Sequence, residues 1–323
     1  MMLSRVAENI YWMARYLERA EDTARLVIAT DQTMLDIAPV SQITPLDWNQ
    51  LLAITGQEAA YRQRHPGPPN EQSIIRFLVG DRESPASIVS SLTWARENLR
   101  STREAFPREM WEFVNEFTRK ILKLSENGVP DAQRHEFLEL VVSEALMIAG
   151  LLDSSMCRDD AFNMFRLGQF LERSDMITRI IDVRGAGMQS TASDDPRAPQ
   201  LDIPLKNAIW LAVLKSLSGD QMYRRRIQPI VRGNQVLAFL LKDPAFPRAF
   251  RYCLDGVTRC LETLGRDQAM RPVLHGLDRA VYLADVGGLA ERGLHAFLDD
   301  LQIRLGNLHN AIQNTYFTHR TEA

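Results

Sequence analysis

The sequence predicts an all-α protein in which one helical bundle is duplicated with pseudo-twofold symmetry. Apolar residues recur at spacings of three and four along nearly the whole chain, whereas alternation with a period of two is hard to find. Segments rich in Gly, Pro, Asn and Asp separate about ten or more helical stretches. A helical motif that contains Leu-Glu-Arg also occurs twice, which indicates the duplication.

The positions of the helix breaks follow from the same segments rich in Gly, Pro, Asn and Asp. They are expected at 38–45, 64–70, 80–85, 126–130, 184–200 and 242–247. The longest helices between and beyond them are expected at the start of the chain, near 130–155, near 159–184 and near 288–318. These four helices are the predicted framework of the fold.

The internal repeat extends well beyond the Leu-Glu-Arg motif. Residues 9–26 match residues 163–180, and residues 48–99 match residues 210–261 without a gap. The second match contains 11 identities in 52 positions, where average composition predicts about three. We therefore expect two helical repeats, residues 1–155 and 156–323, which pack together as one body.

Composition excludes several classes of protein. A hydrophobic content of 45% is ample for a real core, and a net charge of −3 provides no basic surface for nucleic acid or an anionic membrane. No run approaches 18 apolar residues, so no membrane span is expected. Three cysteines form no paired framework, which suggests a reducing compartment. We expect a cytoplasmic protein with neither a nucleic acid nor a membrane as partner.

Both copies of the motif place charged residues on one helical seam. The seam of the first copy is Tyr11, Ala14, Glu18, Glu21 and Arg25, and that of the second is Phe165, Gly168, Glu172, Asp175 and Arg179. Arg19 and Arg173 directly follow the two motif glutamates. Much of the remaining surface of both helices is apolar, so these charges are expected inside the bundle. The small residues would allow another backbone to come close.

Most of these charges have a partner on their own helix, but one does not. Glu21 with Arg25 and Asp175 with Arg179 are favourable i,i+4 pairs. A buried Glu172 lacks such a pair and needs a tertiary partner, a raised pKa or a metal.

Two interpretations of the seam stay open. One is a structural polar network across the pseudo-dyad, for which Glu18 with Arg179 and Glu172 with Arg25 are candidate pairs. The other is a functional site on the same seam that binds a ligand or a metal.

At the level of whole motifs, the chain resembles a known family. "MLSRVAENIYWMARYLERAEDTARLV" and "MCRDDAFNMFRLGQFLERSDMITRIIDVR" are similar to the two signature helices of the alpha-E family, a bacterial all-helical domain named for its Glu-Arg helix. The likeness includes "MYRRR" and "LLKDPAFPRAFRYCL" and runs through most of the chain. Two departures are Met13-Ala14, where the family often has Leu-Gly, and Gln169, where it often has Arg.

This resemblance implies a function but no established reaction. It implies genomic association with a circularly permuted ATP-grasp protein, often with a transglutaminase-like peptidase, and a part in making or modifying peptides. We therefore expect an accessory or substrate-handling partner of an ATP-grasp amide or peptide ligase, without ATP chemistry or a cofactor of its own. The alternatives are an enzyme that uses Glu18 and Glu172 as acid and base or as metal ligands, and a purely structural scaffold. The chain could also form a homo-oligomer.

Two further groups of residues are weaker candidate sites. An arginine-rich stretch could hold a phosphate or a carboxylate; its members are Arg224, Arg225, Arg226 and Arg232. Glu291 and His295 are expected on one helical face. No metal is expected, because the Glu-x-x-His motif of di-metal helix bundles is absent. Gly-rich phosphate loops and GxSxG are also absent, so nucleotide binding or nucleophilic catalysis is not expected.

Overall fold

The computed structural model describes residues 2–37, 47–126, 128–186 and 203–318. Across these residues the chain forms fifteen α-helices and no β-strand, which confirms the predicted all-α class. None of these helices is both long and apolar enough to cross a lipid bilayer.

The helices divide at the short connection between α7 and α8. Before it lie α1 (Ser4–Ile37), α2 (Asn49–Ile54), α3 (Glu58–Arg64), α4 (Glu71–Val79), α5 (Ile88–Thr102), α6 (Arg108–Ser125) and α7 (Asp131–Ser155). After it lie α8 (Asp160–Ile181), α10 (Ile203–Ser216), α11 (Asp220–Arg226), α12 (Gly233–Lys242), α13 (Phe250–Leu264), α14 (Arg271–Leu283), α15 (Val286–Glu291) and α16 (Leu294–Ile312). Short 3₁₀ and π turns extend some of them: η1 (Arg103–Ala105), η2 (Asp182–Ala186), η3 (Asp267–Ala269) and η4 (Gln313–Phe317).

The predicted breaks at 64–70, 80–85, 126–130 and 242–247 coincide with connections between helices, except that Arg64 and Lys242 still end α3 and α12. Residue 127 lies outside the described residues. The segment 38–45 and most of 184–200 lie outside the described residues. One framework helix was predicted wrongly, because 288–318 is not a single helix. Gly293 has a φ of +79° between α15 and α16, a left-handed conformation that a continuing α-helix cannot contain.

Local signals account for several helix ends. The Asp159 side chain accepts a hydrogen bond from the Phe162 backbone N–H and caps the start of α8. Asn70 and Ser73 form a reciprocal capping box at the start of α4. These caps satisfy N–H groups that the first helical turn leaves without a partner.

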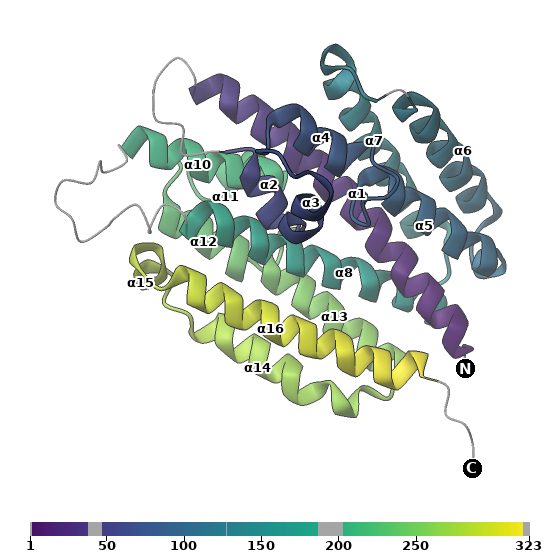
Figure 1. Ribbon diagram of the computed structural model, residues 1–323. Helices are drawn as coiled ribbons and strands as arrows, with labels where there is room; N and C mark the ends of the chain where they lie inside the picture. Colours follow the sequence, from purple (N-terminus) through teal and green to yellow (C-terminus); the bar gives the residue numbers. More distant parts are fainter. Residues whose placement is uncertain (1, 38–46, 127, 187–202, 319–323) are drawn as a thin grey trace.

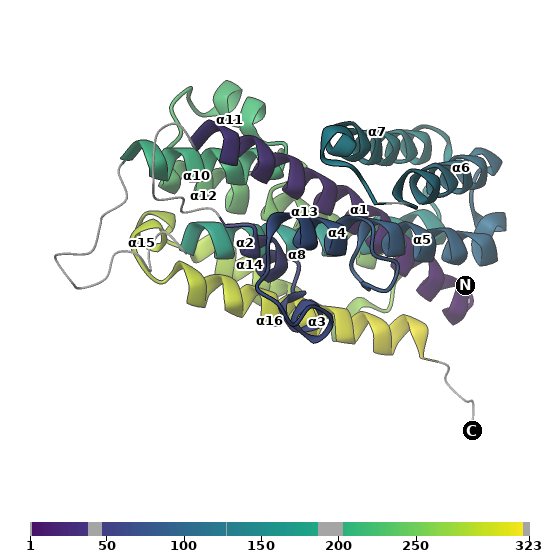
Figure 2. The ribbon, with the colours of Figure 1, turned by 45° about the horizontal axis from the view of Figure 1, so that its top comes forward.

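Two groups of four helices build the body of the protein. In the first, α1, α5, α6 and α7 contact one another in a ring, and in the second α8, α13, α14 and α16 do the same. The two rings meet where α1 packs along α8, as Figures 1 and 2 show. Each of these two helices therefore has neighbours on all sides, and α8 is buried along most of its length.

Features of the first half recur in the second. A shift of 162 residues carries the bounds of α3 and α5 onto those of α11 and α13. The same shift relates two ion pairs, Arg64 with Asp81 at 2.8 Å and Arg226 with Asp243 at 3.2 Å. These recurrences support the duplication, while the twofold relation between the halves stays a prediction.

The α1–α8 contact is closest at Gly168. A Cβ atom added to Gly168 would lie 2.4 Å from the Tyr11 carbonyl oxygen and 3.2 Å from the Ala14 Cβ. Real Cβ atoms do not approach a backbone oxygen so closely. The absence of a side chain at this position therefore sets the distance between the two central helices.

We expect Gly168→Ala to destabilise the protein by about 1–3 kcal/mol or more, because α1 and α8 have to separate to accept the methyl group. Gly150→Ala is the matched control, since Gly150 is also helical and its added Cβ would meet nothing within 4 Å. Denaturant unfolding measures both. The proposed close contact is wrong if Gly168→Ala unfolds at the same denaturant concentration as Gly150→Ala.

Candidate functional site

The two Leu-Glu-Arg motifs exchange their charges across the α1–α8 interface. Arg173 on α8 donates from Nε to Glu18 Oε1 on α1 at 2.6 Å. Arg19 on α1 donates from Nε to Glu172 Oε1 on α8, also at 2.6 Å. We call these four residues the Glu–Arg clasp, because each motif supplies one acid and one base to the other.

A second donor reaches each glutamate from one turn earlier in the opposite motif. Arg15 Nε donates to Glu172 Oε2 at 2.6 Å, and Gln169 Nε2 donates to Glu18 Oε2 at 3.0 Å. Positions 15 and 169 correspond in the repeat. The hydrogen bond is thus kept in both copies, but the positive charge is present only at Arg15.

An arginine from outside the motifs completes the Glu18 side. Arg248, two residues before α13, lies 3.4 Å from Glu18, 2.5 Å from Glu21 and 2.6 Å from Asp22. It is 7% exposed, so all these charges meet away from water. Sequence reasoning missed Arg248, because it follows Pro247 in a connecting segment and has no helical spacing to the seam.

The partners suggested from the sequence for the two glutamates were wrong. Glu18 pairs with Arg173 and not with Arg179, and Glu172 pairs with Arg19 and Arg15 and not with Arg25. Arginines one residue after each glutamate reach across, whereas those seven residues after it form their ion pairs with acids of their own helices.

The two pairs expected within single helices are confirmed. Glu21 and Arg25 lie 2.8 Å apart, and Asp175 and Arg179 lie 2.9 Å apart.

The clasp keeps both glutamates ionised. Their side chains are 0% and 4% exposed, and this burial alone would raise their pKa values. Arg173 and Arg248 outweigh burial at Glu18, and Arg19 and Arg15 do so at Glu172, so that both pKa values fall to about 2. A carboxylate with so low a pKa is a poor proton donor or acceptor near neutral pH.

Asp22 behaves in the opposite way. Burial and the adjacent Glu18 charge raise the pKa of Asp22 to about 8, although Arg248 favours its ionised form. Three acids compete for Arg248, and Asp22 Oδ2 has no hydrogen-bond partner among the described residues. Burial and the Glu18 charge therefore favour the protonated form of Asp22 at neutral pH.

Tyr11 and Phe165, which correspond in the repeat, have different surroundings. The buried Tyr11 hydroxyl donates to His309 Nδ1 on α16 at 2.8 Å and accepts from Arg15 Nη1 at 3.2 Å. Burial and the Arg15 charge lower the pKa of His309 to about 4, so its imidazole is neutral at pH 7.

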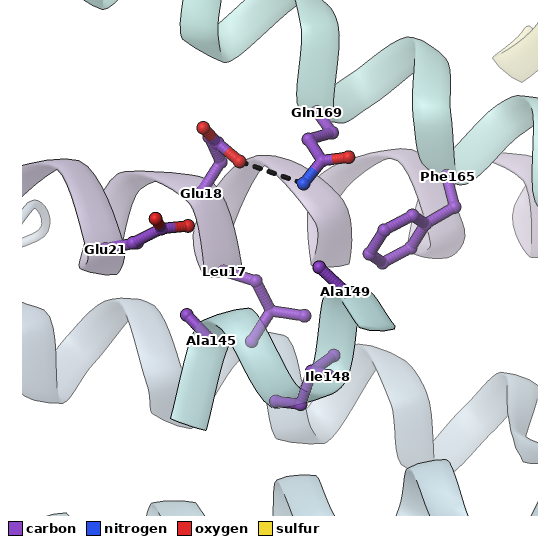
Figure 3. Close-up of a pocket in the computed structure, with 8 residues that line it drawn as sticks. All are labelled: Leu17, Glu18, Glu21, Ala145, Ile148, Ala149, Phe165 and Gln169. Atoms are coloured by element: carbon purple, nitrogen blue, oxygen red, sulfur yellow. Dashed lines mark hydrogen bonds between the residues drawn. The ribbon is translucent and has the colours of Figure 1, made fainter. Parts of the chain in front are cut away.

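Phe165 instead borders a small cavity on the Glu18 side, shown in Figure 3. The lining is completed by Leu17, Glu18, Glu21, Ala145, Ile148, Ala149 and Gln169. Its volume of about 10 Å³ is close to the minimum for one water molecule, so it cannot admit a substrate.

The arginine-rich stretch is a separate, exposed feature. Arg224, Arg225 and Arg226 form the last turn of α11, where positive charge is favourable, and Arg232 precedes α12. Arg226 pairs with Asp243, and all four side chains are exposed. This stretch does not contribute to the clasp.

The expected pairing of Glu291 with His295 on one helical face was wrong. Glu291 ends α15 and His295 follows the break at Gly293, where it contacts Asp182 at 2.8 Å. Among the described residues, no three acids, histidines or cysteines are grouped as metal ligands would be.

Sequence reasoning also missed a larger cavity of about 270 Å³ beside α2 and α3. It is lined by Asn49, Leu52, Glu58, Tyr61, Arg62, Gly67 and Pro69. Its two charged lining residues face each other at 3.7 Å, which leaves no excess charge to recognise an ionic ligand.

The helical fold and the paired Glu-Arg motifs define a member of the Alpha-E family. The model of this family, described as a predicted alpha-helical domain with a conserved ER motif, matches residues 2–317. The chain therefore belongs to the Alpha-E family. In this structure, the two ER motifs are Glu18-Arg19 and Glu172-Arg173, the members of the clasp.

Relatives with similar sequences occur in mycobacteria. The chain is 25% identical over 289 residues to "Uncharacterized protein Rv2567" of Mycobacterium tuberculosis and to "Uncharacterized protein Mb2597" of Mycobacterium bovis. Each match covers 83% of this chain but 31% of the relative, so the chain spans about a third of the length of these relatives. No solved structure matches the chain.

We expect Glu172→Gln to destabilise the protein more than Glu18→Gln at pH 7. The first change leaves Arg15 and Arg19 without an acid, a loss that can approach 3–5 kcal/mol. The second change is partly offset, because Asp22 can then ionise beside Arg248.

Unfolding as a function of pH tests this order. The glutamate pKa is lower in the folded state than its usual value of 4.5, so the stability it contributes is present above pH 4.5 and lost as the pH falls towards 2. The gap between the parent and Glu172→Gln should therefore close in acid. An unchanged gap, or equal stability at pH 7, would contradict the ion-pair role.

In contrast to the two glutamate substitutions, we expect Asp22→Asn to stabilise the protein near neutral pH. The folded pKa of Asp22 lies above its usual 3.8, so the parent loses stability as the pH rises from about 4 to about 8. Asparagine cannot ionise, and the variant should gain melting temperature relative to the parent between pH 5 and pH 8.5. A relative loss over this range would show that Asp22 is ionised in the folded protein.

Proposed function

We propose that this chain is a helical partner module that handles substrate for a separate ATP-grasp-type ligase in peptide synthesis or modification. The main observation behind this proposal is that arginines of the opposite motif neutralise both motif glutamates. Their low pKa values make them structural anchors and poor acid–base catalysts. Bond-forming chemistry is therefore assigned to the partner.

Membership of the Alpha-E family supports this proposal through its association with ATP-grasp proteins. The lengths of the mycobacterial relatives are also consistent with it, because the matched part makes up 31% of each relative and leaves room for another function in the same chain. A transglutaminase-like peptidase is the second candidate partner, and we propose a cytoplasmic location for the complex.

An enzyme that works through Glu18 and Glu172 is the alternative. A general acid or base works best with a pKa near the operating pH, whereas these two carboxyl groups have pKa values of about 2. A purely structural scaffold is the second alternative. Binding of a partner or a substrate discriminates the proposal from the scaffold.

We expect the chain to copurify with an ATP-grasp protein encoded beside it when the two are expressed together. ATP consumption by that protein, measured with a peptide substrate, should increase when the chain is added. The isolated chain should hydrolyse ATP only at background, since its sequence contains no Gly-rich phosphate-binding motif.

Turnover by the isolated chain that is lost in Glu18→Gln or Glu172→Gln variants that still fold would support the enzyme alternative. Absence of both copurification and any effect on ATP consumption would support the scaffold.

A further inference from the structure

Arg15 and Arg19 have donor atoms left over after they bind Glu172. Each uses its Nε atom for the carboxylate, and Arg15 Nη1 also bonds Tyr11. Arg15 Nη2 and both Nη atoms of Arg19 make no hydrogen bond to any residue that the structure describes. The two side chains are 11% and 22% exposed, so the cluster borders solvent and is not sealed inside the protein.

The charges in this cluster do not balance. Two guanidinium groups share one carboxylate, while His309 has a pKa of about 4 and is neutral at pH 7. Asp175, the next acid that acts on Arg15, is already paired with Arg179 at 2.9 Å. One positive charge of this mostly buried group is thus left without a counter-charge among the described residues, an arrangement that favours an anionic ligand.

Aromatic rings hold the two guanidinium groups in place. Arg15 lies over the Trp12 ring at 5.1 Å, and Arg19 lies over the Tyr16 ring at 5.6 Å. Trp12 and Tyr16 stack on each other with ring centroids 5.7 Å apart. These contacts restrict the arginine side chains, so less conformational freedom is lost when a ligand binds.

The corresponding position in the second repeat lacks the arginine. Gln169 occupies the place of Arg15 and still bonds the opposite glutamate at 3.0 Å. The chain therefore shows how the clasp is completed by a neutral donor. It follows that the charge of Arg15 is not needed for the hydrogen bond that it makes to Glu172.

We propose that Arg15 and Arg19, with the Trp12–Tyr16 platform, form an oxyanion-binding site whose ligand is the carboxylate of a peptide or an N-acylated amino acid. Guanidinium groups match the planar geometry of a carboxylate and can donate two hydrogen bonds to it. The choice of a carboxylate rests on the proposed function, because the acid substrate of an amide ligase carries this group. A phosphate shares the same chemistry and is distinguished by experiment.

The test uses the isolated full chain and the indole N–H signal of Trp12 in NMR spectra, assigned with Trp12→Phe. N-acetylalanine, its methylamide and inorganic phosphate are titrated separately. We expect saturable binding of N-acetylalanine, no saturable binding of the uncharged methylamide, and weaker binding of phosphate.

Arg15→Gln is the informative variant, because it copies the natural Gln169 arrangement and should remain folded. It should bind N-acetylalanine at least tenfold more weakly than the parent. Arg5→Gln is the matched control on the same helix, where Arg5 is exposed and outside the cluster, and its affinity should equal that of the parent.

Equal affinity in folded Arg15→Gln, equal binding of the methylamide, or no saturation by either anion would overturn the site. Saturation by phosphate without N-acetylalanine would overturn the carboxylate assignment and identify a phosphate ligand. The measurement needs no partner protein, so its failure is distinct from a failure to copurify with the ligase.

Discussion

Two glutamates can lie buried between α1 and α8 because each receives the arginine of the opposite motif. Removing the charge of one partner would leave the other uncompensated in an apolar interior, and such a loss costs several kcal/mol. The two rings of four helices meet at this interface. Each ring therefore supplies the charges that neutralise the motif glutamate of the other. The two copies of the ER motif that characterises the family thus pair with each other and form one contact.

The surroundings of Glu18 and of Glu172 differ, and the differences suit the first to stability and the second to recognition. Both glutamates have two or more donors, so both sides of the clasp are satisfied. On the Glu18 side, Arg248 pairs with Glu21 and Asp22, and the neighbouring cavity has room for one water at most, too small for a ligand. The Glu172 side has surplus guanidinium donors, aromatic faces and a neutral histidine near the surface. We propose that the two corresponding places have diverged, the Glu18 side serving stability and the Glu172 side serving binding.

Periodicity was sufficient to predict the all-α class, the burial of the two motif glutamates and the pairs within single helices, whereas the duplication is predicted by the internal sequence match. Asp175 and Arg179, at the end of the second seam, stay partly exposed. It could not identify the partners across the interface, because these depend on how two helices are rotated against each other. Arg248 and His309 were missed for the same reason, since both come from segments far from the motifs in sequence. The break at Gly293 was missed because apolar spacing continues through it, and only the left-handed backbone at that residue ends the helix.

The close approach at Gly168 also constrains motion. A slip of α8 along α1 by one helical turn, a shift of about 5.4 Å, would bring the side chain of Phe165 or Glu172, on the same face as Gly168, towards the Tyr11 carbonyl oxygen. The same slip would lengthen the Nε–carboxylate distances of the clasp, which are 2.6 Å. Steric and electrostatic barriers thus oppose sliding along the same axis. A protein that docks across both halves would meet a preformed surface and would not have to pay the entropy of fixing one half against the other.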